Sequence, residues 1–445
     1  MFSKLLIAAR GEIAVRIIRA CREMGISTVA VYSQADQPSL HVSLADEAVC
    51  VGPPPGKDSY LNMSNIVSAA LITGAEAVHP GCGFLAENAS FAELCQACGL
   101  VWVGPSPRAM EEMGNKARAR EIAEDAGIPT IPGTKGAISG ESDALKFAKR
   151  HGYPLGIKAA AGGGGKGIRV VLTDDDLLPS LQAAQTEAQA AFGDSSVYLE
   201  KWLESPRHIE VQVLGDEHGT VLHLGERQCS VQSRNQKLLE EAPFAGLPGD
   251  LRARIAESAV KVARAAGYSN AGTVEFLMDR QGGYYFMEMN TRIQVEHPVT
   301  EAITGLDLVK LQIAVAAGEP MPLQQSEVRF LGHAIECRIN AADPDRNFAP
   351  CPGPVGSLRL PGGLGVRIDT HLYAGYEIPP YYDSLVAKLI TWGQDRDEAI
   401  ARMLRSLDEL QVGDRKTTIP LHRRILNSPR FRANDVSTSF LETLQ

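Results

Sequence analysis

The stretch Gly283-Tyr-Tyr-Phe-Met-Glu-Met-Asn-Thr-Arg-Ile-Gln-Val-Glu-His-Pro298 concentrates chemically useful side chains. It opens with aromatic and large apolar residues behind a Gly-Gly pair, a pattern that predicts a β-strand. The preceding run, residues 272–278, predicts a second strand, and the connector 279–283 has the composition of a turn. We therefore expect an antiparallel hairpin at this point of the chain.

The register of this hairpin decides which side chains meet. If Gln281 and Gly282 form the turn, Glu275 lies directly opposite Glu288, and Asn290 points to the same side as Glu288. Two facing carboxylates destabilise a sheet unless a cation lies between them. The oxygens of Glu275, Glu288 and Asn290 suit Mg²⁺ or Mn²⁺ carrying nucleotide phosphates. The alternative is a pair of exposed strand carboxylates.

The residues that follow continue the alternation. Arg292, Gln294 and Glu296 supply a cation, an amide and a carboxylate at every second position, and His297-Pro298 ends the run. Beside a metal, such a set predicts an anion-binding site with its own general base.

Composition limits the class of protein. The 445 residues are 44% hydrophobic and 22% charged, which predicts a globular chain of roughly two to four domains. No apolar run approaches a membrane span, and residues 1–10 predict a first strand rather than a signal peptide. A net charge of −9 argues against a nucleic-acid partner. The eight cysteines show no zinc or disulfide pattern, so we expect a reducing cytoplasm.

The first hundred residues predict an open α/β sheet. Strand 4–9, helix 11–24 and strand 28–33 form a βαβ unit, and further strands fit at 47–51, 75–79 and 100–104. The first turn lacks G-x-G-x-x-G, so NAD binding is not supported. The loop 79–88 follows a predicted strand at the edge where such sheets bind ligands, although it could equally be a simple turn.

Four consecutive glycines lie between two predicted strands in residues 153–172. Glycine lets backbone N–H groups approach phosphate oxygens, and the missing Lys-Ser/Thr excludes a Walker A loop. We predict a mobile hairpin lid over phosphates, with Lys158 at its base and Lys166 at its tip; the alternative is a flexible hairpin loop. Lys116, on a predicted helix 108–127, is by itself an ordinary surface lysine.

The remaining segments add candidates from strands and loops. The strand 197–203 suits an adenine edge or is an ordinary core strand. Strands are predicted at 208–213 and 221–227, and residues 228–237 are predicted as a long polar loop that ends at Lys237. A strand at 333–340 carries Arg338, and short β segments at 381–384 precede a final amphipathic helix at 397–410.

Taken together, the lid, the metal carboxylates and the anion-site residues resemble the ATP-grasp fold. The strings that resemble biotin carboxylases are Arg10-Gly-Glu-Ile-Ala, His79-Pro-Gly, 287–298, Glu336-Cys-Arg-Ile-Asn340 and Pro379-Pro-Tyr-Tyr-Asp-Ser384. The resemblance implies an α/β and α+β chain: a Rossmann-like domain at 1–113, an ATP-grasp domain at 114–330 with a lid at about 131–203, and a mostly β domain at 331–445.

The resemblance also implies an ATP-dependent ligase that forms a C–N bond. ATP phosphorylates bicarbonate to carboxyphosphate, which breaks down beside biotin, and the products are ADP, phosphate and N-carboxybiotin. Glu296 is then the base and Arg338 stabilises the biotin enolate, with Lys237 and Arg292 completing the catalytic set.

The family's ligand contacts carry over to positions that match its motifs. ATP contacts fall on Lys116, Lys158, Gly164, Gly165, Glu200, Lys201, Trp202, Leu203, His208, Gln232, Asn235, Glu275 and Glu288. Two Mg²⁺ (or Mn²⁺) ions fall on Glu275, Glu288 and Asn290. Bicarbonate falls on Lys237, Arg292, Gln294 and Val295, and biotin on Cys82, Gly83 and Arg338.

Partners follow from the same resemblance. The chain has no Met-Lys-Met site for biotin and no room for a carboxyltransferase, so we expect a separate biotin carboxyl carrier protein and a separate carboxyltransferase, as in acetyl-CoA carboxylase of fatty acid biosynthesis. Family members are commonly homodimers. No membrane partner is expected.

The chain departs from the family pattern at a few positions. Cys82 stands where tyrosine is usual, Ser233 and Asn235 replace an arginine and a histidine, and Ala9 and Ala161 replace an asparagine and a lid glycine. Asn235 is reminiscent of the urea carboxylase branch, so the final carboxyl acceptor stays open. Two alternatives remain: another ATP-grasp ligase joining a carboxylate to an amine, and a non-catalytic ATP-binding homologue.

Overall fold

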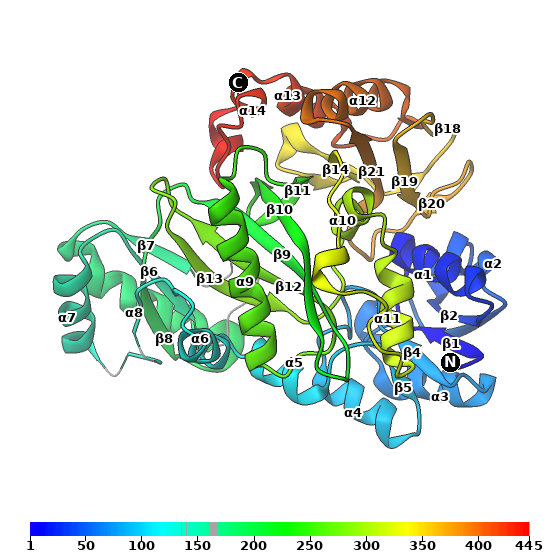
Figure 1. The fold of residues 1–445 in the computed structure, drawn as a ribbon, viewed down its shortest axis with the longest axis horizontal. Coiled ribbons are helices and arrows are strands. Elements are labelled where there is room, and N and C mark those ends of the chain that lie inside the picture. Colours follow the sequence, from blue (N-terminus) through cyan, green and yellow to red (C-terminus); the bar gives the residue numbers. More distant parts are fainter. Residues whose placement is uncertain (135, 139, 160–167, 445) are drawn as a thin grey trace.

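The computed structural model describes residues 1–134, 136–138, 140–159 and 168–444 (Figure 1). The N-terminal unit is a parallel sheet in the order β3-β2-β1-β4-β5. Its elements are β1 (Lys4–Ile7), α1 (Gly11–Glu23), β2 (Ser27–Ser33), α2 (Leu40–Leu44), β3 (Glu47–Gly52), α3 (Met63–Thr73), β4 (Ala77–His79), α4 (Ala89–Ala97) and β5 (Val101–Trp102). Helix α1 packs on one face of the sheet and α3 and α4 on the other, which confirms the predicted open α/β sheet.

The helix predicted at 108–127 is two helices. Helix α5 (Pro107–Gly114) ends before Asn115, and α6 (Lys116–Asp125) begins after it. The Asn115 side chain accepts hydrogen bonds from the backbone N–H groups of Ala117 and Arg118, both at 3.1 Å. This N-cap starts a new helix and places Lys116 in its first turn.

A small separate layer contains the strands that flank the glycine run. Strands β6 (Leu155–Ala159), β7 (Ile168–Val171) and β8 (Val197–Lys201) pair in the order β7-β6-β8, with α7 (Glu141–His151) and α8 (Asp174–Phe192) packed against them. This layer projects from the side of the molecule (Figure 1, teal). Strands β6 and β7 pair antiparallel, as predicted for a hairpin. Gly164, Gly165, Lys166 and Ala161 lie outside the described residues.

An antiparallel sheet of eight strands forms the centre, in the order β13-β12-β9-β10-β11-β14-β21-β19. Its strands are β9 (Arg207–Gly215), β10 (Val221–Ser233), β11 (Gln236–Ala242), β12 (Asn270–Met278), β13 (Tyr284–Asn290), β14 (His333–Asn340), β19 (Val366–Thr370) and β21 (Leu385–Gly393). Helix α9 (Gly249–Ala265) covers one face (Figure 1) and packs on Ile209, Val211 and Val213. The alternate side chains of β9 therefore point to the opposite face.

The polar loop predicted at 228–237 is wrong, because these residues form a hairpin. Strand β10 runs to Ser233, and β11 starts at Gln236. The two turn residues have left-handed backbone angles, with φ of 52° at Arg234 and 63° at Asn235. Asparagine tolerates this region better than most residues, so Asn235 suits a tight two-residue turn.

The C-terminal part also differs from expectation. Residues 381–384 are not a strand, and α12 (Arg396–Glu409) is followed by α13 (Ile419–Asn427) and α14 (Pro429–Arg432). Helices α10 (His297–Thr304) and α11 (Leu308–Ala316) precede β14. The short strands pair as β15 (Ala342–Asp343) with β16 (Ala349–Pro350), β17 (Gly353–Pro354) with β20 (Glu377–Ile378), and β18 (Leu358–Arg359) with β22 (Gln411–Val412).

Within the described ranges, no helix combines the length and the apolar character needed to cross a bilayer. All eight cysteines are free thiols.

Candidate functional site

One large cavity, of about 2310 Å³, is lined by residues from the N-terminal sheet unit, the β6–β8 layer, the central sheet and the C-terminal segment. Its walls come from the loops after β1 and β4, from β6 and β8, from the central sheet, and from residues 438–444 at the C-terminal end. All of the predicted site residues that the structure describes line this cavity. Side chains from distant parts of the sequence therefore reach one enclosed space.

The hairpin of β12 and β13 places the predicted metal ligands. Glu275 lies opposite Glu288, and Thr273 lies opposite Asn290, as the predicted register requires. A bulge between Glu275 and Phe276 shifts the pairing by one residue toward the turn, so the predicted register is wrong at that end. The prediction is confirmed where the carboxylates lie.

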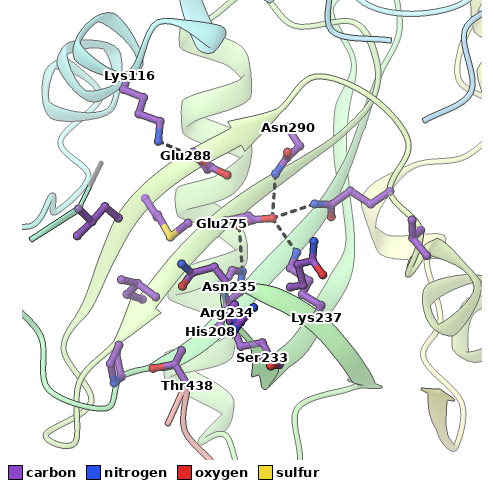
Figure 2. Close-up of a pocket in the computed structure, with 18 of the residues that line it drawn as sticks. Lys116, His208, Ser233, Arg234, Asn235, Lys237, Glu275, Glu288, Asn290 and Thr438 are labelled. Carbon is purple, nitrogen blue, oxygen red and sulfur yellow. Dashed lines mark hydrogen bonds and ion pairs between the residues drawn. The ribbon is translucent and has the colours of Figure 1, made fainter. Parts of the chain in front are cut away.

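Burial disfavours both facing carboxylates as ions, but Lys237 and His208 together outweigh burial at Glu275 and hold the pKa of Glu275 well below its ordinary value. Burial and the charge of Glu275 raise the pKa of Glu288. Asn290 Nδ2 donates to Glu275 Oε1 at 2.8 Å, and Lys116 Nζ lies 3.9 Å from Glu288 Oε2 (Figure 2). Since oxygen ligands converge and repel each other here, this group fits a hard divalent cation.

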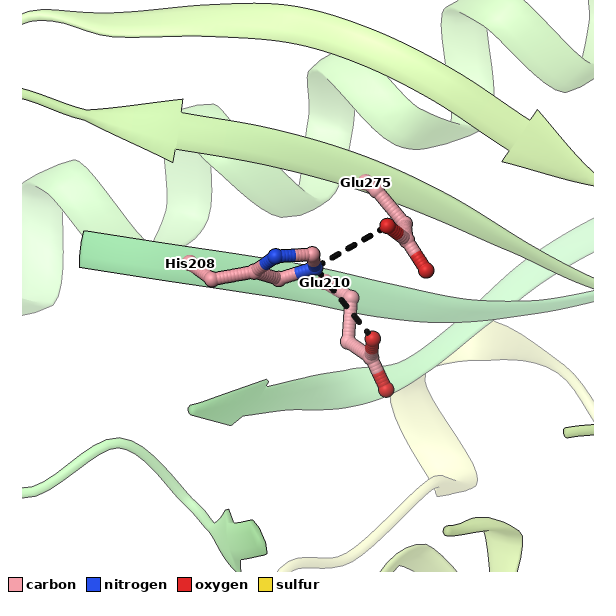
Figure 3. A group of neighbouring side chains, drawn as sticks. All are labelled: His208, Glu210 and Glu275. Atoms are coloured by element: carbon pink, nitrogen blue, oxygen red, sulfur yellow. Dashed lines mark ion pairs between the residues drawn. The ribbon is translucent and has the colours of Figure 1, made fainter. Parts of the chain in front are cut away.

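A neighbouring cluster contains His208, Glu210 and Glu275, whose ligand atoms lie within 4.8 Å of one another (Figure 3). His208 Nε2 lies 3.0 Å from Glu275 Oε2 and 3.7 Å from Glu210 Oε2. Burial disfavours the charged imidazole, but the charge of Glu275 and the side-chain contacts with Glu210 and Glu275 together outweigh burial and raise the pKa of His208 to about 9. A protonated imidazole is a cation for phosphates rather than a metal ligand.

Lys237 joins three carboxylates at the floor of the cavity. Its Nζ donates to Glu210 at 2.5 Å, to Glu296 at 2.7 Å and to Glu275 at 2.8 Å. Burial opposes the charge, but these carboxylates raise the pKa of Lys237 well above its ordinary value. The ammonium therefore stays ionised and links Glu275 (Figure 2) to Glu296.

Glu210 and Arg227 were not predicted from the sequence. Both are fully buried, and Arg227 Nε donates to Glu210 Oε1 at 2.5 Å. Arg227 Nη2 also donates to Gln294 Oε1 at 2.8 Å, so it fixes a predicted bicarbonate ligand. The signal available was the alternation His208, Glu210, Gln212 in a strand, the same pattern that identified Glu288 and Asn290.

Glu296 lies between two cations. It is the residue before α10, its Oε1 accepts from Lys237, and its Oε2 accepts from Arg338 Nη2 at 2.9 Å. Burial and the charge of Glu210 would raise its pKa, but the charges of Lys237, Arg338 and Arg227 together outweigh them and lower the pKa of Glu296. Arg338 Nε also donates to Glu240 at 2.6 Å. A buried, ionised carboxylate can accept a proton from a ligand that displaces one of these cations.

The anion-site residues are not on a strand, contrary to the predicted alternation. Strand β13 ends at Asn290, and residues 291–296 form a loop that leads into α10. The side chains nevertheless converge, because the loop is held at both ends. Arg292 Nε lies 3.0 Å from Glu87 Oε2, and the Val295 carbonyl accepts from Lys388 Nζ at 2.9 Å. Glu87 and Lys388 were not predicted.

The end of the cavity that is predicted to hold the nucleotide is lined by residues of β6, β8, β10 and the C-terminal segment. Lys158 on β6 is ion-paired with Glu200 on β8, and Lys201 Nζ donates to the Tyr153 carbonyl at 2.7 Å. Trp202, Leu203 and Gln232 also line the cavity. Thr438, which was not predicted, closes this end beside Ser233 and Asn235 (Figure 2).

Cys82 and Gly83 line the opposite end, in the loop after β4. Burial raises the pKa of the Cys82 thiol to about 11, so it is neutral. The predicted ligand loop 79–88 therefore does reach the cavity, and Cys82 presents a small neutral wall where a tyrosine would add an aromatic one.

Comparison with known proteins places this geometry in a family. The chain matches the family models described as "Biotin carboxylase, N-terminal domain" over residues 1–110, "Carbamoyl-phosphate synthase L chain, ATP binding domain" over 115–324, and "Biotin carboxylase C-terminal domain" over 336–443. It is 56% identical to a biotin carboxylase of Nostoc sp. PCC 7120, covering 100% of this chain and 99% of that protein.

Two further relatives extend the comparison. A pyruvate carboxylase subunit of Methanothermobacter thermautotrophicus is 52% identical, over 99% of this chain and 90% of that one. The solved biotin carboxylase domain dimer of the Hydrogenobacter thermophilus 2-oxoglutarate carboxylase, in complex with MgADP, ADP and bicarbonate, has a TM-score of 0.94 at 50% identity, covering 99% of this chain and 97% of that one. The matched domains, the near-complete coverage and the shared fold show that the chain belongs to the biotin carboxylase family.

Proposed function

We propose that the chain carboxylates biotin, using ATP and bicarbonate, and forms ADP, phosphate and N-carboxybiotin. The observation that carries this function is the position of Glu296. An ionised carboxylate lies between Lys237 and Arg338, and Lys237 also contacts the metal carboxylate Glu275. A base, an anion-binding cation and a nucleotide-metal site in direct contact are what phosphorylation of bicarbonate requires.

The nucleotide binds between the lid strands and the central sheet. Glu275, Glu288 and Asn290 hold two Mg²⁺ (or Mn²⁺) ions, which supply charge neutralisation for the β- and γ-phosphates. Lys116, Lys158 and the protonated His208 add positive charge around the phosphates. The adenine end is formed by Glu200, Lys201, Trp202, Leu203, Gln232 and Asn235. Gly164 and Gly165 belong to the same proposal through the family resemblance.

Bicarbonate binds to Arg292, Gln294, Lys237 and the backbone of Val295. Glu296 takes the bicarbonate proton, and the resulting oxyanion attacks the γ-phosphorus while the bond to the β-γ bridging oxygen breaks and ADP leaves. The product is carboxyphosphate. Lys237 is suited to this step because its three carboxylate contacts fix the ammonium where the negative charge develops.

Carboxyphosphate then breaks at its C–O bond to give CO₂ and phosphate beside biotin. The phosphate released in that cleavage takes the proton of the ureido nitrogen, and the nitrogen attacks CO₂, forming the C–N bond. Arg338 stabilises the enolate oxygen of biotin, with Cys82 and Gly83 lining the ring. Arg338 is already oriented by Glu240 and Glu296, so little reorganisation is needed when the oxyanion forms.

The same proposal covers organisation and partners. We infer three units at 1–113, 114–330 and 331–445, a homodimer, and biotin presented on a carrier protein whose carboxybiotin a carboxyltransferase consumes. The named relatives belong to carboxylases with different acceptors, pyruvate and 2-oxoglutarate among them, so acetyl-CoA is one candidate acceptor. The free cysteines support a reducing, cytoplasmic location.

ADP release by the purified protein tests the function, with ATP, Mg²⁺, bicarbonate and free biotin each omitted in turn. We expect release that requires bicarbonate and rises with biotin. Release that ignores bicarbonate but needs an amine and another carboxylate would indicate a different ATP-grasp ligase. ATP binding without release, with carrier proteins present, would indicate a non-catalytic homologue.

A further inference from the structure

Two glutamates lie near Arg338, and the mechanism above uses only one of them, Glu240, to orient the guanidinium. Glu240 on β11 and Glu336 on β14 are direct partners across the antiparallel pair, and both are fully buried. Directly opposed residues of such a pair have Cβ atoms about 5 Å apart. The strands therefore bring two carboxyl groups close together in a region that water does not reach.

Their hydrogen bonds are too few for two carboxylates. Glu240 Oε1 accepts from Arg338 Nε at 2.6 Å. Among the described residues, the other oxygen of Glu240 and both oxygens of Glu336 find no hydrogen-bond partner. A buried carboxylate without donors is strongly disfavoured relative to the neutral acid. Glu336 is thus the member of the pair that the protein does not equip to be ionised.

The directions of the two pKa shifts agree with this assignment. Burial raises the pKa of Glu240 to about 7, although Arg338 lowers it. Burial raises the pKa of Glu336 well above its ordinary value, although Lys388 lowers it.

The groups facing the pair come from each neighbouring element. Charged groups are Arg338, Lys388, Lys237 and Glu296, and neutral ones are the thiols of Cys229 on β10 and Cys337 on β14. Lys388 is itself shared, because its Nζ lies 3.1 Å from Glu12 and 4.0 Å from Asp369. If both glutamates were ionised, Arg338 would balance one of the two negative charges. No cation among the described residues is free to balance the other.

We propose that Glu240 and Glu336 hold one proton between them during turnover, with Glu336 as the residue that sets the charge around Arg338. This inference rests on the proposed function, because the positive field of Arg338 matters only if bicarbonate and the biotin enolate bind beside it. Glu336 contacts no reactant and acts through Arg338. When the pair loses its proton at high pH, the net charge near Arg338 falls by one and the anionic ligands are held less well.

Glu336→Gln tests the proposal, because glutamine imitates the neutral acid. We expect the alkaline limb of kcat/KM for bicarbonate to move at least one pH unit upward in this variant. The matched control is Glu241→Gln, whose side chain is equally buried but binds Arg396 and His333 away from the cavity. Its alkaline limb should coincide with that of the parent. An unmoved limb in Glu336→Gln, or an equal loss at every pH, would overturn the proposal.

Thermal unfolding between pH 5 and 9 gives a readout that needs no turnover. The folded parent keeps a proton on Glu336 that the unfolded chain releases above pH 4.5, so the parent should lose stability relative to Glu336→Gln as the pH rises. The difference in Tm between variant and parent should therefore grow with pH. A constant or shrinking difference would overturn the proposal even in an inactive protein, whereas inactivity alone would count only against the proposed function.

A second variant covers the case in which Glu336→Gln does not fold. Glu240→Gln removes the carboxyl group on the other strand. Glu336 is then the only acid of the pair, so the pair can no longer carry two negative charges. We expect kcat to fall, because Arg338 loses one acceptor, and the alkaline limb to move upward as well. A limb at the parent's pH in this variant would contradict the shared proton.

Discussion

Replacing Glu296 by glutamine removes the proposed base with little change in shape. The glutamine oxygen can still accept one hydrogen bond from Lys237 or Arg338, which the parent contacts at 2.7 and 2.9 Å. What it cannot do is take the proton of bicarbonate. We therefore expect Glu296→Gln to lose bicarbonate-dependent ATP cleavage while the fold and nucleotide binding persist.

The magnitudes follow from these contacts. A positioned general base contributes about 10²–10⁴ in rate, so kcat should fall by that factor. Stability should fall by only about 1–3 kcal/mol, because each cation keeps another partner. Lys237 retains Glu210 and Glu275, and Arg338 retains Glu240. The loss in rate is thus much larger than the loss in folding free energy.

Three measurements on one preparation test this prediction. They are bicarbonate-dependent ADP release, ADP affinity by calorimetry, and unfolding by denaturant. Glu226→Gln is a matched control, since Glu226 is also buried and ion-paired, with Arg252 Nε at 2.8 Å, but does not line the cavity. Turnover of Glu296→Gln within tenfold of the parent would refute the role of Glu296 as base.

Three further predictions follow from the site and its surroundings. Glu288→Gln removes the carboxylate opposite Glu275 and should abolish the rise in Tm that MgADP gives the parent; an unchanged rise in calorimetric or thermal-shift titrations would place the metal elsewhere. Cys82→Tyr adds an aromatic wall and should lower the KM for free biotin several-fold, and a KM that is equal or higher would show that the ring does not lie against this position. Burial alone would raise the pKa of Asp36, but the hydrogen bonds and charge of Arg10 outweigh burial and lower that pKa from 3.8 to about 2. The lowered pKa contributes about 2 kcal/mol of stability above pH 3.8. This stability is lost as the pH falls through 2. The free energy of unfolding of Asp36→Asn should therefore lack this fall at acid pH. Parallel curves of unfolding free energy against pH for parent and variant would disprove the role of Asp36.

The hairpin shows what a local pattern can predict. Alternation and turn composition were enough to place Glu275 opposite Glu288, because a two-stranded register depends on adjacent residues alone. The bulge after Glu275 was not predictable, since it depends on packing of the neighbouring strand and leaves no mark in composition. The facing of Glu275 and Glu288 was therefore predicted correctly, although the predicted pairing was wrong between the bulge and the turn.

The base site shows the limit of such patterns. Alternation with Arg292 and Gln294 marked Glu296 as a base, and the family resemblance implied the same role, but its partners Lys237 and Arg338 come from the adjacent strands β11 and β14, far away in sequence. Glu210 shares the alternation of its strand, yet alternation cannot show that Arg227 and Lys237 lie on the same face. These contacts depend on the order of eight strands, and strand order is set by long-range packing rather than by any local spacing.

The prediction of a loop at residues 228–237 failed for a third reason. Polar residues between Gln228 and Lys237 predicted a loop, but residues 232–237 line the cavity from two strands and the turn between them. Left-handed backbone angles at Arg234 and Asn235 make the turn, and arginine carries no turn signal by itself. A strand facing an active site thus imitates the composition of a surface loop.

Transfer of ¹⁸O from labelled bicarbonate into phosphate tests the central claim most directly. If bicarbonate attacks the γ-phosphorus and carboxyphosphate later breaks at its C–O bond, each phosphate released carries one oxygen that came from bicarbonate. We predict one ¹⁸O per phosphate in the parent, measured by mass spectrometry during turnover with biotin before label exchanges with water. Phosphate that carries no label while ADP accumulates would mean that water attacks ATP, and would contradict the proposed activation of bicarbonate.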